Sequence, residues 1–203
     1  MFIFVKLPSN LSRLKQMQIQ VDMDIVEVDR DKKRYLGLLL AGDESEAMID
    51  RYLGRGTLYV GYVSGLPVAV CVTTDEDDVT VEVRNLAVRE DMRRRGLGRQ
   101  MLGHVERMNP EKTIILGTGE TPSTLRFYQS CGFRYTHRIA GFFTENYPRP
   151  IVEEGVILCD MVYFMKNGRC YCGRSAQILT ILRIFVNDFK DNIWIKNIKN
   201  ADI

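Results

Sequence analysis

The 203-residue sequence contains no apolar run long enough to cross a bilayer. Its longest apolar stretches, such as residues 38–41 and 181–186, fall far short of the roughly 20 residues that a membrane-spanning helix needs. Residues 1–6 are partly apolar, but they show neither a preceding basic segment nor a small-residue cleavage site, so they do not predict a signal peptide. We therefore expect a cytoplasmic protein without a membrane partner.

Neither sign of charge dominates, since 28 Lys and Arg against 26 Asp and Glu leave a net charge of +2. A nucleic-acid binder shows a strongly basic face, so this charge balance does not indicate one, and we expect no nucleic-acid partner. The five cysteines are an odd number without a framework spacing, which fits a reducing cytoplasm. Cys170 and Cys172 form a C-x-C, but zinc sites usually use two C-x2-C pairs, which are missing. We expect no metal.

Histidine is scarce, with His104 and His137 as the two examples. A covalent acyl-cysteine route through Cys131 would require an activating histidine. His104 falls on an expected helix and His137 on a later expected strand, so we interpret the placement of both as incidental.

The length suits one domain with a sizeable core and leaves too little for two comfortable ones. Three regions differ in composition: an N-terminal extension at 1–22, an α/β domain at 23–166 and a C-terminal tail at 167–203. Within the tail, residues 175–189 have the apolar spacing of an amphipathic helix. This helix would pack on the domain or form the contact of a homodimer.

Hydrophobic periodicity predicts most elements of the central domain. Strands are expected at 24–28, 57–63, 66–73, 79–88, 112–116, 134–139 and 156–164. Helices are expected at 31–40, at 44–52, after the loop 89–98 as far as about 108, and at 122–130. The apolar face of the third helix consists of Leu97, Met101, Leu102, Val105 and Met108. This order predicts a mixed α/β sandwich with antiparallel strands and not a doubly wound sheet.

A polar loop rich in arginine and glycine joins an expected strand to an expected helix. Backbone N–H groups at a helix N-terminus are unpaired and carry a partial positive charge, and glycines let that backbone approach a ligand closely. Neighbouring arginines add charge-assisted hydrogen bonds, so this pattern is typical of a pyrophosphate site. The loop consists of Arg93, Arg94, Arg95, Gly96, Leu97 and Gly98.

The residues that follow this loop do not match either of two common nucleotide-binding motifs. A P-loop requires Lys and then Ser or Thr after the glycine, whereas Arg99 and Gln100 stand here. The dinucleotide fingerprint requires a small residue where Met101 stands. A solvated arginine-rich turn stays open as an alternative. A basic RNA-contact patch is a third, but no aromatic residue occurs within 89–99 to support it.

The loop resembles the acyl-CoA-binding motif Gln/Arg-x-x-Gly-x-Gly/Ala of the GNAT superfamily of N-acetyltransferases. Arg93, Gly96 and Gly98 match this motif. The chain also resembles the family in the apolar-Ala-Val end of the preceding strand, and in the Tyr-x-x-x-Gly-Phe helix end that runs from Tyr128 to Phe133. The resemblance covers residues 23–166. Within the family, the chain is similar to a bacterial branch whose members are sometimes labelled indole-acetic-acid acetyltransferases.

The resemblance implies a mostly antiparallel sheet that is flanked by helices and splayed at the acyl-CoA site. It also implies acetyl-CoA as co-substrate. Thr121 stands where many members have Asn, and its hydroxyl could still donate to the pantetheine arm. The implied contacts are Leu86, Ala87, Val88, Arg93, Arg94, Arg95, Gly96, Leu97, Gly98, Arg99 and Thr121.

The resemblance further implies direct acetyl transfer, within a ternary complex, to the amine of a small molecule. A catalytically idle acyl-CoA-binding regulatory module of the same fold is the alternative. Glu82 is the candidate base, and alternation of side chains would place Glu82, Arg84 and Leu86 on one face of their strand. A plain ion pair of Glu82 with Arg84 or a neighbouring lysine stays equally open.

Tyr128 is the candidate acid for the departing thiolate, and a core aromatic residue is the alternative. Backbone N–H groups around Leu86, Ala87 and Val88 would hold the thioester carbonyl. The segment that follows the strand at 134–139 could form the wall of the acceptor site, with Glu145 attracting a cationic amine, or could form a loop that packs only. Its candidate acceptor residues are Phe142, Phe143, Glu145 and Tyr147.

Overall fold

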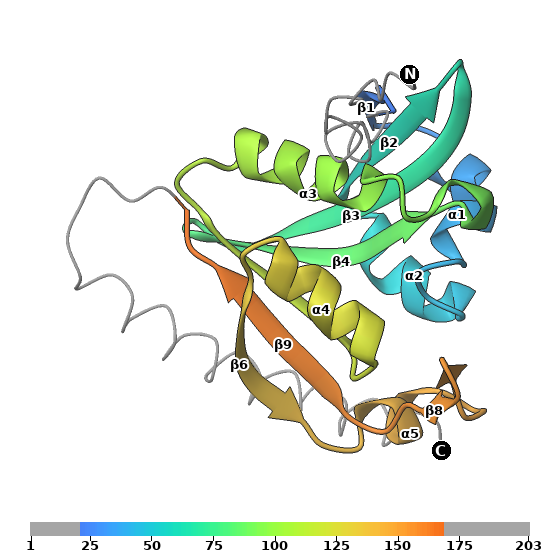
Figure 1. The fold of residues 1–203 in the computed structure, drawn as a ribbon, viewed down its shortest axis with the longest axis vertical. Helices are drawn as coiled ribbons and strands as arrows, with labels where there is room; N and C mark the ends of the chain where they lie inside the picture. Colours follow the sequence, from blue (N-terminus) through green and yellow to red (C-terminus); the bar gives the residue numbers. More distant parts are fainter. Residues whose placement is uncertain (1–20, 169–203) are drawn as a thin grey trace, which may run out of the picture.

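A seven-stranded sheet forms the centre of the computed structural model, which describes residues 21–168 (Figure 1). The strand order in this sheet is β1-β2-β3-β4-β5-β9-β6. Strands β4 and β5 pair in parallel, and every other pair of neighbouring strands in this sheet is antiparallel. The mixed, mostly antiparallel architecture predicted from the sequence is therefore confirmed. The strands are β1 (Asp24–Val28), β2 (Thr57–Val63), β3 (Leu66–Asp77), β4 (Thr80–Val88), β5 (Thr113–Gly119), β6 (Arg134–Ile139) and β9 (Met161–Lys166).

Helices cover both faces of the sheet. They are α1 (Leu36–Leu39), α2 (Glu46–Leu53), α3 (Leu97–Met108), α4 (Pro122–Ser130) and α5 (Phe142–Asn146), with 3-10 turns η3 (Lys32–Tyr35) and η4 (Glu90–Met92). Buried side chains of α1 and α2 pack on β2, β3 and β4 in one apolar cluster. Those of α3 and α4 form a second cluster on the opposite face, over β3, β4, β5 and β9 (Figure 1).

The predicted apolar face of α3 is confirmed at four of its five positions. Leu97, Met101, Leu102 and Val105 are buried in the cluster between α3 and the sheet. Met108 is 52% exposed, because it is the last residue of the helix and is not part of that cluster.

A β-bulge in β4 reverses the side-chain alternation that the sequence predicts. Val72 pairs with Asn85 and Thr73 with Val83, so Arg84 is an extra residue without a direct partner on β3. After the bulge, Leu86 packs with the α3 cluster, whereas Glu82 lies on the opposite face. The prediction that Glu82, Arg84 and Leu86 share one face is therefore wrong for Leu86.

Strands β4 and β5 diverge after half of their length. Their ladder starts at Thr80 with Thr113 and ends at Val83 with Leu116. From there, among the strands that the structure describes, β5 pairs with β9 alone, and β4 continues to Val88 paired with β3 alone. The predicted splay of the sheet is present at this point. Within the described part of the chain, it leaves one backbone edge of β4, from Arg84 to Val88, without a strand partner on the β5 side.

The connection between β6 and β9 differs most from the sequence prediction. The single strand expected at 156–164 is wrong: a short hairpin of β7 (Val152–Glu153) and β8 (Val156–Ile157) comes first, and β9 starts at Met161. Glu154 and Gly155 form the turn with φ of 52° and 77°. Positive φ at both central turn residues is typical of tight hairpins. The preceding α5 was not predicted as a helix.

Other boundaries shift as well, such as the end of β5, which is at Gly119 rather than 116. The helix expected at 31–40 is a short 3-10 turn followed by four residues of α1, and Gly37 lies inside it. Strand β3 extends to Asp77, beyond the expected end at 73. No helix within residues 21–168 is long and apolar enough to cross a membrane. The extension at 1–22 is almost wholly outside the described residues, as are the expected helix at 175–189 and Cys170 with Cys172.

The start of α3 makes a close contact with α4 that depends on Gly98. A Cβ atom at this position would lie 3.1 Å from a ring carbon of Phe127. At Gly103, on the same helix, the nearest atom to a Cβ would be Arg107 Nη1 at 3.6 Å. Glycine at 98 therefore lets the two helices approach, whereas glycine at 103 does not have that role.

We predict that Gly98→Leu lowers the free energy of unfolding by about 1–3 kcal/mol, because an overpacked contact forces the helices apart. Gly103→Leu should leave that free energy unchanged or raise it by up to about 1 kcal/mol, since leucine is the better helix former. Urea unfolding of both variants measures the difference. Equal stabilities would show that the contact with Phe127 does not limit residue 98.

Candidate active site

The loop before α3 presents a helix N-terminus that no side chain of residues 21–168 caps. Gly96, with a φ of 82°, is the residue before the first turn. The first backbone hydrogen bond of the helix is donated by Gln100 to Gly96 O. The amides of the first turn are therefore available to an external acceptor, at the end of α3 that carries partial positive charge. This geometry suits an anion.

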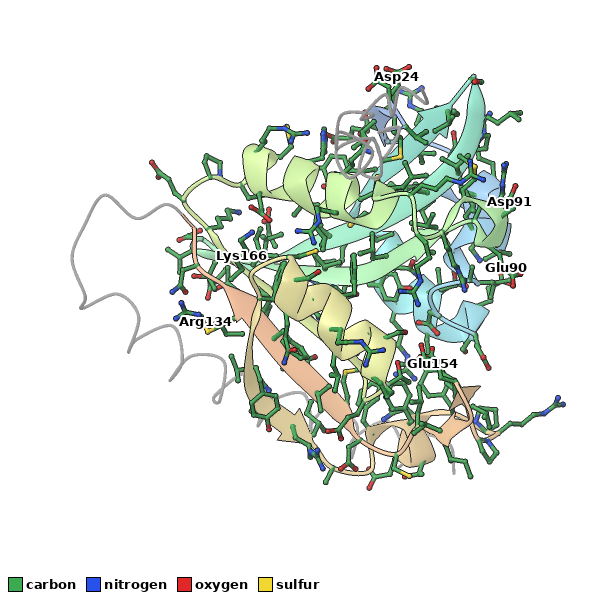
Figure 2. The ribbon with its side chains drawn as sticks, in the orientation of Figure 1. Asp24, Glu90, Asp91, Arg134, Glu154 and Lys166 are labelled. Carbon is green, nitrogen blue, oxygen red and sulfur yellow. The ribbon has the colours of Figure 1, made fainter. Side chains whose placement is uncertain are left out.

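Exposed arginines surround this helix end. Arg93 donates from Nε to Val88 O at 3.1 Å, which fixes its stem against the end of β4. Arg95 donates from Nη2 to Asp91 O at 3.2 Å. Figure 2 labels Glu90 and Asp91 on the turn before α3. Arg93 and Arg95 are therefore held by backbone carbonyl oxygens near the end of β4, and Arg94 between them is exposed.

Arg99 is held elsewhere. Its Nη1 donates to Ser130 O at 2.8 Å and its Nη2 to Ser130 Oγ at 2.9 Å. These contacts tie α3 to the C-terminal end of α4. Of the predicted phosphate-binding arginines, Arg99 therefore has a structural partner already.

Glu82 lies on β4, just before the divergence, and is 6% exposed. Its Oε2 forms an ion pair with Arg84 Nη2 at 3.0 Å, as one of the two sequence interpretations predicts. Arg84 Nη2 also lies 3.2 Å from Glu76 Oε1, so one guanidinium serves two carboxylates. Burial of the guanidinium lowers the pKa of Arg84. The electrostatic attraction of Glu82, Tyr163 and Glu76 is larger than this effect, so the pKa of Arg84 is raised overall.

Tyr163 is a site residue that sequence reasoning missed. Its hydroxyl donates to Glu82 Oε1 at 3.2 Å, across the intervening strand β5. Gly117 on β5 makes room, since a Cβ there would lie 3.0 Å from the Tyr163 ring. His137 on β6 stacks on the other side, with ring centroids 4.7 Å apart. The glycine in the middle of an apolar strand was the signal that could have found this contact.

Tyr128 lies in the apolar cluster under α4. It makes edge-to-face contacts with Phe127 at 5.0 Å and Phe133 at 6.0 Å between ring centroids. Burial raises its pKa well above the ordinary value of a phenol, so the hydroxyl stays protonated near neutral pH. The neighbouring Thr121 is buried and donates to Thr124 Oγ1 at 2.9 Å. The core position expected as the alternative for Tyr128 is therefore present.

The connection between β6 and β9 has a small apolar core of its own. Phe143, Ile151 and Leu158 are buried there, and Phe142 and Tyr147 pack against them. A Cβ on Gly119 would lie 2.5 Å from Leu158 Cδ1, so this core is seated directly on the end of β5. The predicted acceptor segment thus lies where β4 and β5 have diverged.

Tyr147 links this connection to the opposite side of the divergence. Its hydroxyl donates to Asp43 Oδ1 at 3.1 Å, on the turn between α1 and α2. The Tyr52 hydroxyl donates to Asp43 Oδ2 at 3.4 Å and accepts from Asn85 Nδ2 at 3.0 Å. Asp43, Tyr52 and Asn85 were not predicted as site residues. Glu145, which was, is exposed on α5.

The β7–β8 hairpin closes over the N-terminal end of α4. Glu154 at its tip accepts hydrogen bonds from the backbone N–H of Ser123, at 3.3 Å, and from the Ser123 hydroxyl. Figure 2 shows Glu154 beside this end of the helix. The hydrogen bond from Ser123 lowers the pKa of Glu154, as expected for a carboxylate at a helix N-terminus.

Within residues 21–168, no group of three or more His, Cys, Asp and Glu side chains is arranged to hold a metal ion. The described cysteines, Cys71, Cys131 and Cys159, are free thiols. The Cys71 pKa is raised to about 12 by complete burial, so this thiol is not a nucleophile near neutral pH.

Comparison with known proteins places this geometry in a family. The Acetyltransferase (GNAT) domain profile matches residues 54–135. The uncharacterised N-acetyltransferase YvbK of Bacillus subtilis (strain 168) is 36% identical over 129 residues, which are 62% of this chain and 83% of YvbK.

Two solved structures share the fold over most of the described residues. A GNAT family acetyltransferase from Elizabethkingia anophelis, with acetyl-CoA bound, has a TM-score of 0.67 and 32% identity over 71% of this chain and 97% of its own. An IAA acetyltransferase from Bacillus cereus ATCC 14579 has a TM-score of 0.68 and 29% identity over 72% of this chain and 99% of its own. The extent of these matches, together with the loop at the start of α3, shows that the chain belongs to the GNAT family of acetyltransferases.

Proposed function

We propose that the protein transfers the acetyl group of acetyl-CoA directly to the amine of a small molecule, with both substrates bound together. The observation that carries the proposal is the juxtaposition of two features. The N-terminus of α3 lies beside the end of β4, since a Cβ on Gly98 would be 3.8 Å from Val88 Cγ2. Among residues 21–168, no side chain caps this helix end, and no strand pairs with β4 on its β5 side from Arg84 to Val88. One feature suits a pyrophosphate, and the other suits an amide-rich arm.

The residues present fit acetyl-CoA, which supplies an activated acetyl thioester. The amides of Leu97 and Gly98 and the side chains of Arg93, Arg94 and Arg95 would hold the phosphates. The open edge of β4 around Leu86, Ala87 and Val88 would pair with the pantetheine arm, and its N–H groups would hold the thioester carbonyl. The acetyl-CoA in the Elizabethkingia anophelis relative supports this assignment.

The acceptor would approach from the face opposite α3 and α4. Residues on that face of β4, such as Asn85, contact the α1–α2 side of the protein. There the hydrogen bond between Tyr147 and Asp43 joins the two segments that flank the divergence. This hydrogen bond favours a small acceptor over a folded protein, because a protein chain could enter only if the two segments were separated.

Glu82 would take the proton of the attacking amine, directly or through water, because an aliphatic amine is protonated near neutral pH. Arg84 and the Tyr163 hydroxyl orient the carboxylate for this purpose. Tyr128, which burial keeps protonated, would protonate the departing thiolate.

We predict that acetyl-CoA raises the melting temperature, whereas NAD and ATP do not. A ligand at about 100 times its Kd stabilises the folded protein by about 2.7 kcal/mol, which raises the melting temperature by roughly 5–10 °C for a chain of this size.

Gly96→Asp should weaken acetyl-CoA binding at least about tenfold, since a carboxylate would repel phosphates at the helix N-terminus.

Gly65→Asp is the matched control for this prediction. Gly65 has a φ of 77° and, like Gly96, no neighbour within 4 Å of a Cβ, but it lies in the β2–β3 turn. Binding of acetyl-CoA should be normal in this variant. An unchanged melting temperature of the parent protein with acetyl-CoA would refute the proposed cofactor.

We predict that Glu82→Gln and Tyr128→Phe each lower kcat by about 10²–10⁴ while acetyl-CoA affinity is retained, because each removes one proton-transfer group. Glu76→Gln removes the other carboxylate on Arg84, and Tyr135→Phe removes an exposed hydroxyl; both should keep activity. Steady-state kinetics with an amine panel and calorimetric acetyl-CoA titration provide the two readouts. Normal kcat in both first variants would remove the assigned roles, and binding without turnover by the parent protein would favour the idle regulatory module.

A further inference from the structure

Asp43 joins the α1–α2 region to a segment that lies 104 positions later in the sequence. It lies on the turn between α1 and α2, and its carboxylate accepts from Tyr52 on α2 and from Tyr147 after α5. Tyr52 in turn accepts from Asn85, which lies just after the bulge of β4. Asp43 is thus connected to the stretch of β4 that the proposed function assigns to the reacting groups.

The Asp43 carboxylate is half-buried and has no cationic partner among residues 21–168. Its hydrogen-bond donors are the Ser45 amide, at 3.1 Å, and the two neutral phenols. Burial raises the pKa of Asp43, although these hydrogen bonds lower it in part. A desolvated carboxylate held by neutral donors alone is costly, so a purely structural tie would be made more favourably by a neutral side chain.

Unused hydrogen-bonding capacity remains at this corner. An ionised carboxylate offers about four acceptor positions, and three are occupied here. The contact to Oδ2 is the longest at 3.4 Å, so Oδ2 keeps an acceptor position. Asn85, on the same chain of hydrogen bonds, is 3% exposed, and its Oδ1 has no hydrogen-bond partner among the described residues. Gly42, the residue before Asp43, covers that oxygen, since a Cβ on Gly42 would lie 2.5 Å from it. An additional N–H donor would therefore bind at Asp43 Oδ2.

We propose that Asp43 binds the acceptor, taking the ammonium group of an aliphatic amine that is cationic at neutral pH. This inference rests on the proposed function and specifies its substrate class. Tyr147 and Tyr52 hold the carboxylate in place, and Asn85 connects its position to β4. Asp43 rather than Glu145 is the recognition residue, because Glu145 is exposed on α5 and Asp43 is joined to the sheet.

The test compares Asp43→Asn with the parent protein on two acceptors of similar size, an aliphatic primary amine and a neutral arylamine, at saturating acetyl-CoA. Loss of a charge-assisted hydrogen bond should raise KM for the aliphatic amine by about ten- to a hundredfold. The arylamine KM and the acetyl-CoA KM should change less than about twofold, and the melting temperature should stay the same. Glu111→Gln, at an exposed carboxylate between α3 and β5, is the acidic control and should leave both acceptor KM values unchanged.

Calorimetric binding of the same amines to the complex with CoA separates the two proposals. Amine binding that Asp43→Asn abolishes supports the inference even where no acetyl transfer occurs, an outcome that would overturn the proposed reaction alone. Acetylation with the same aliphatic-amine KM in Asp43→Asn and parent protein would overturn the inference alone. A parallel rise in the KM of both acceptors would show a structural role of Asp43 and would also overturn it. Neither binding nor transfer of the aliphatic amine by the parent protein would overturn both.

Discussion

Strands β4 and β5 stop sharing hydrogen bonds after Val83 and Leu116, and the rest of the site depends on this divergence. A sheet that stayed paired to the end of β4 would have no free backbone edge between its two faces. The divergence is stabilised from both sides, because β4 keeps its ladder with β3 and β5 keeps its ladder with β9. Backbone polar groups are costly to leave unpaired, so an exposed edge inside a sheet indicates a place for a ligand.

The bulge at Arg84 decides which side chains of β4 lie on each face of the sheet. Before it, Glu82 lies on the face of Tyr163, and after it Leu86 packs toward α3 while Asn85 reaches α2. Without the extra residue, the polar groups after Arg84 would turn into the α3 cluster. One inserted residue therefore keeps charged and polar side chains together on the face that we assign to the acceptor.

The parts of the site that could be predicted from sequence are local. The glycine and arginine pattern of 93–98 lies in one continuous stretch, so its chemistry is legible without the fold. The bulge could not be predicted, because it depends on the pairing of β4 with β3. The contact of Tyr163 with Glu82 and that of Tyr147 with Asp43 join residues 81 and 104 positions apart, so neither has a local signal. The same holds for the break between β8 and β9, where Asp160 accepts from the Gly141 amide.

In the proposed complex, acetyl-CoA lies along the open edge of β4 with its phosphates at the start of α3. Amide NMR during an acetyl-CoA titration tests this most directly, since it reports on each backbone N–H separately. We expect the largest shifts at residues 84–88 and 94–99, with small changes in the β7–β8 hairpin and in β1. Saturable shifts elsewhere, with the amides of Leu86, Ala87, Val88, Leu97 and Gly98 unmoved, would contradict it.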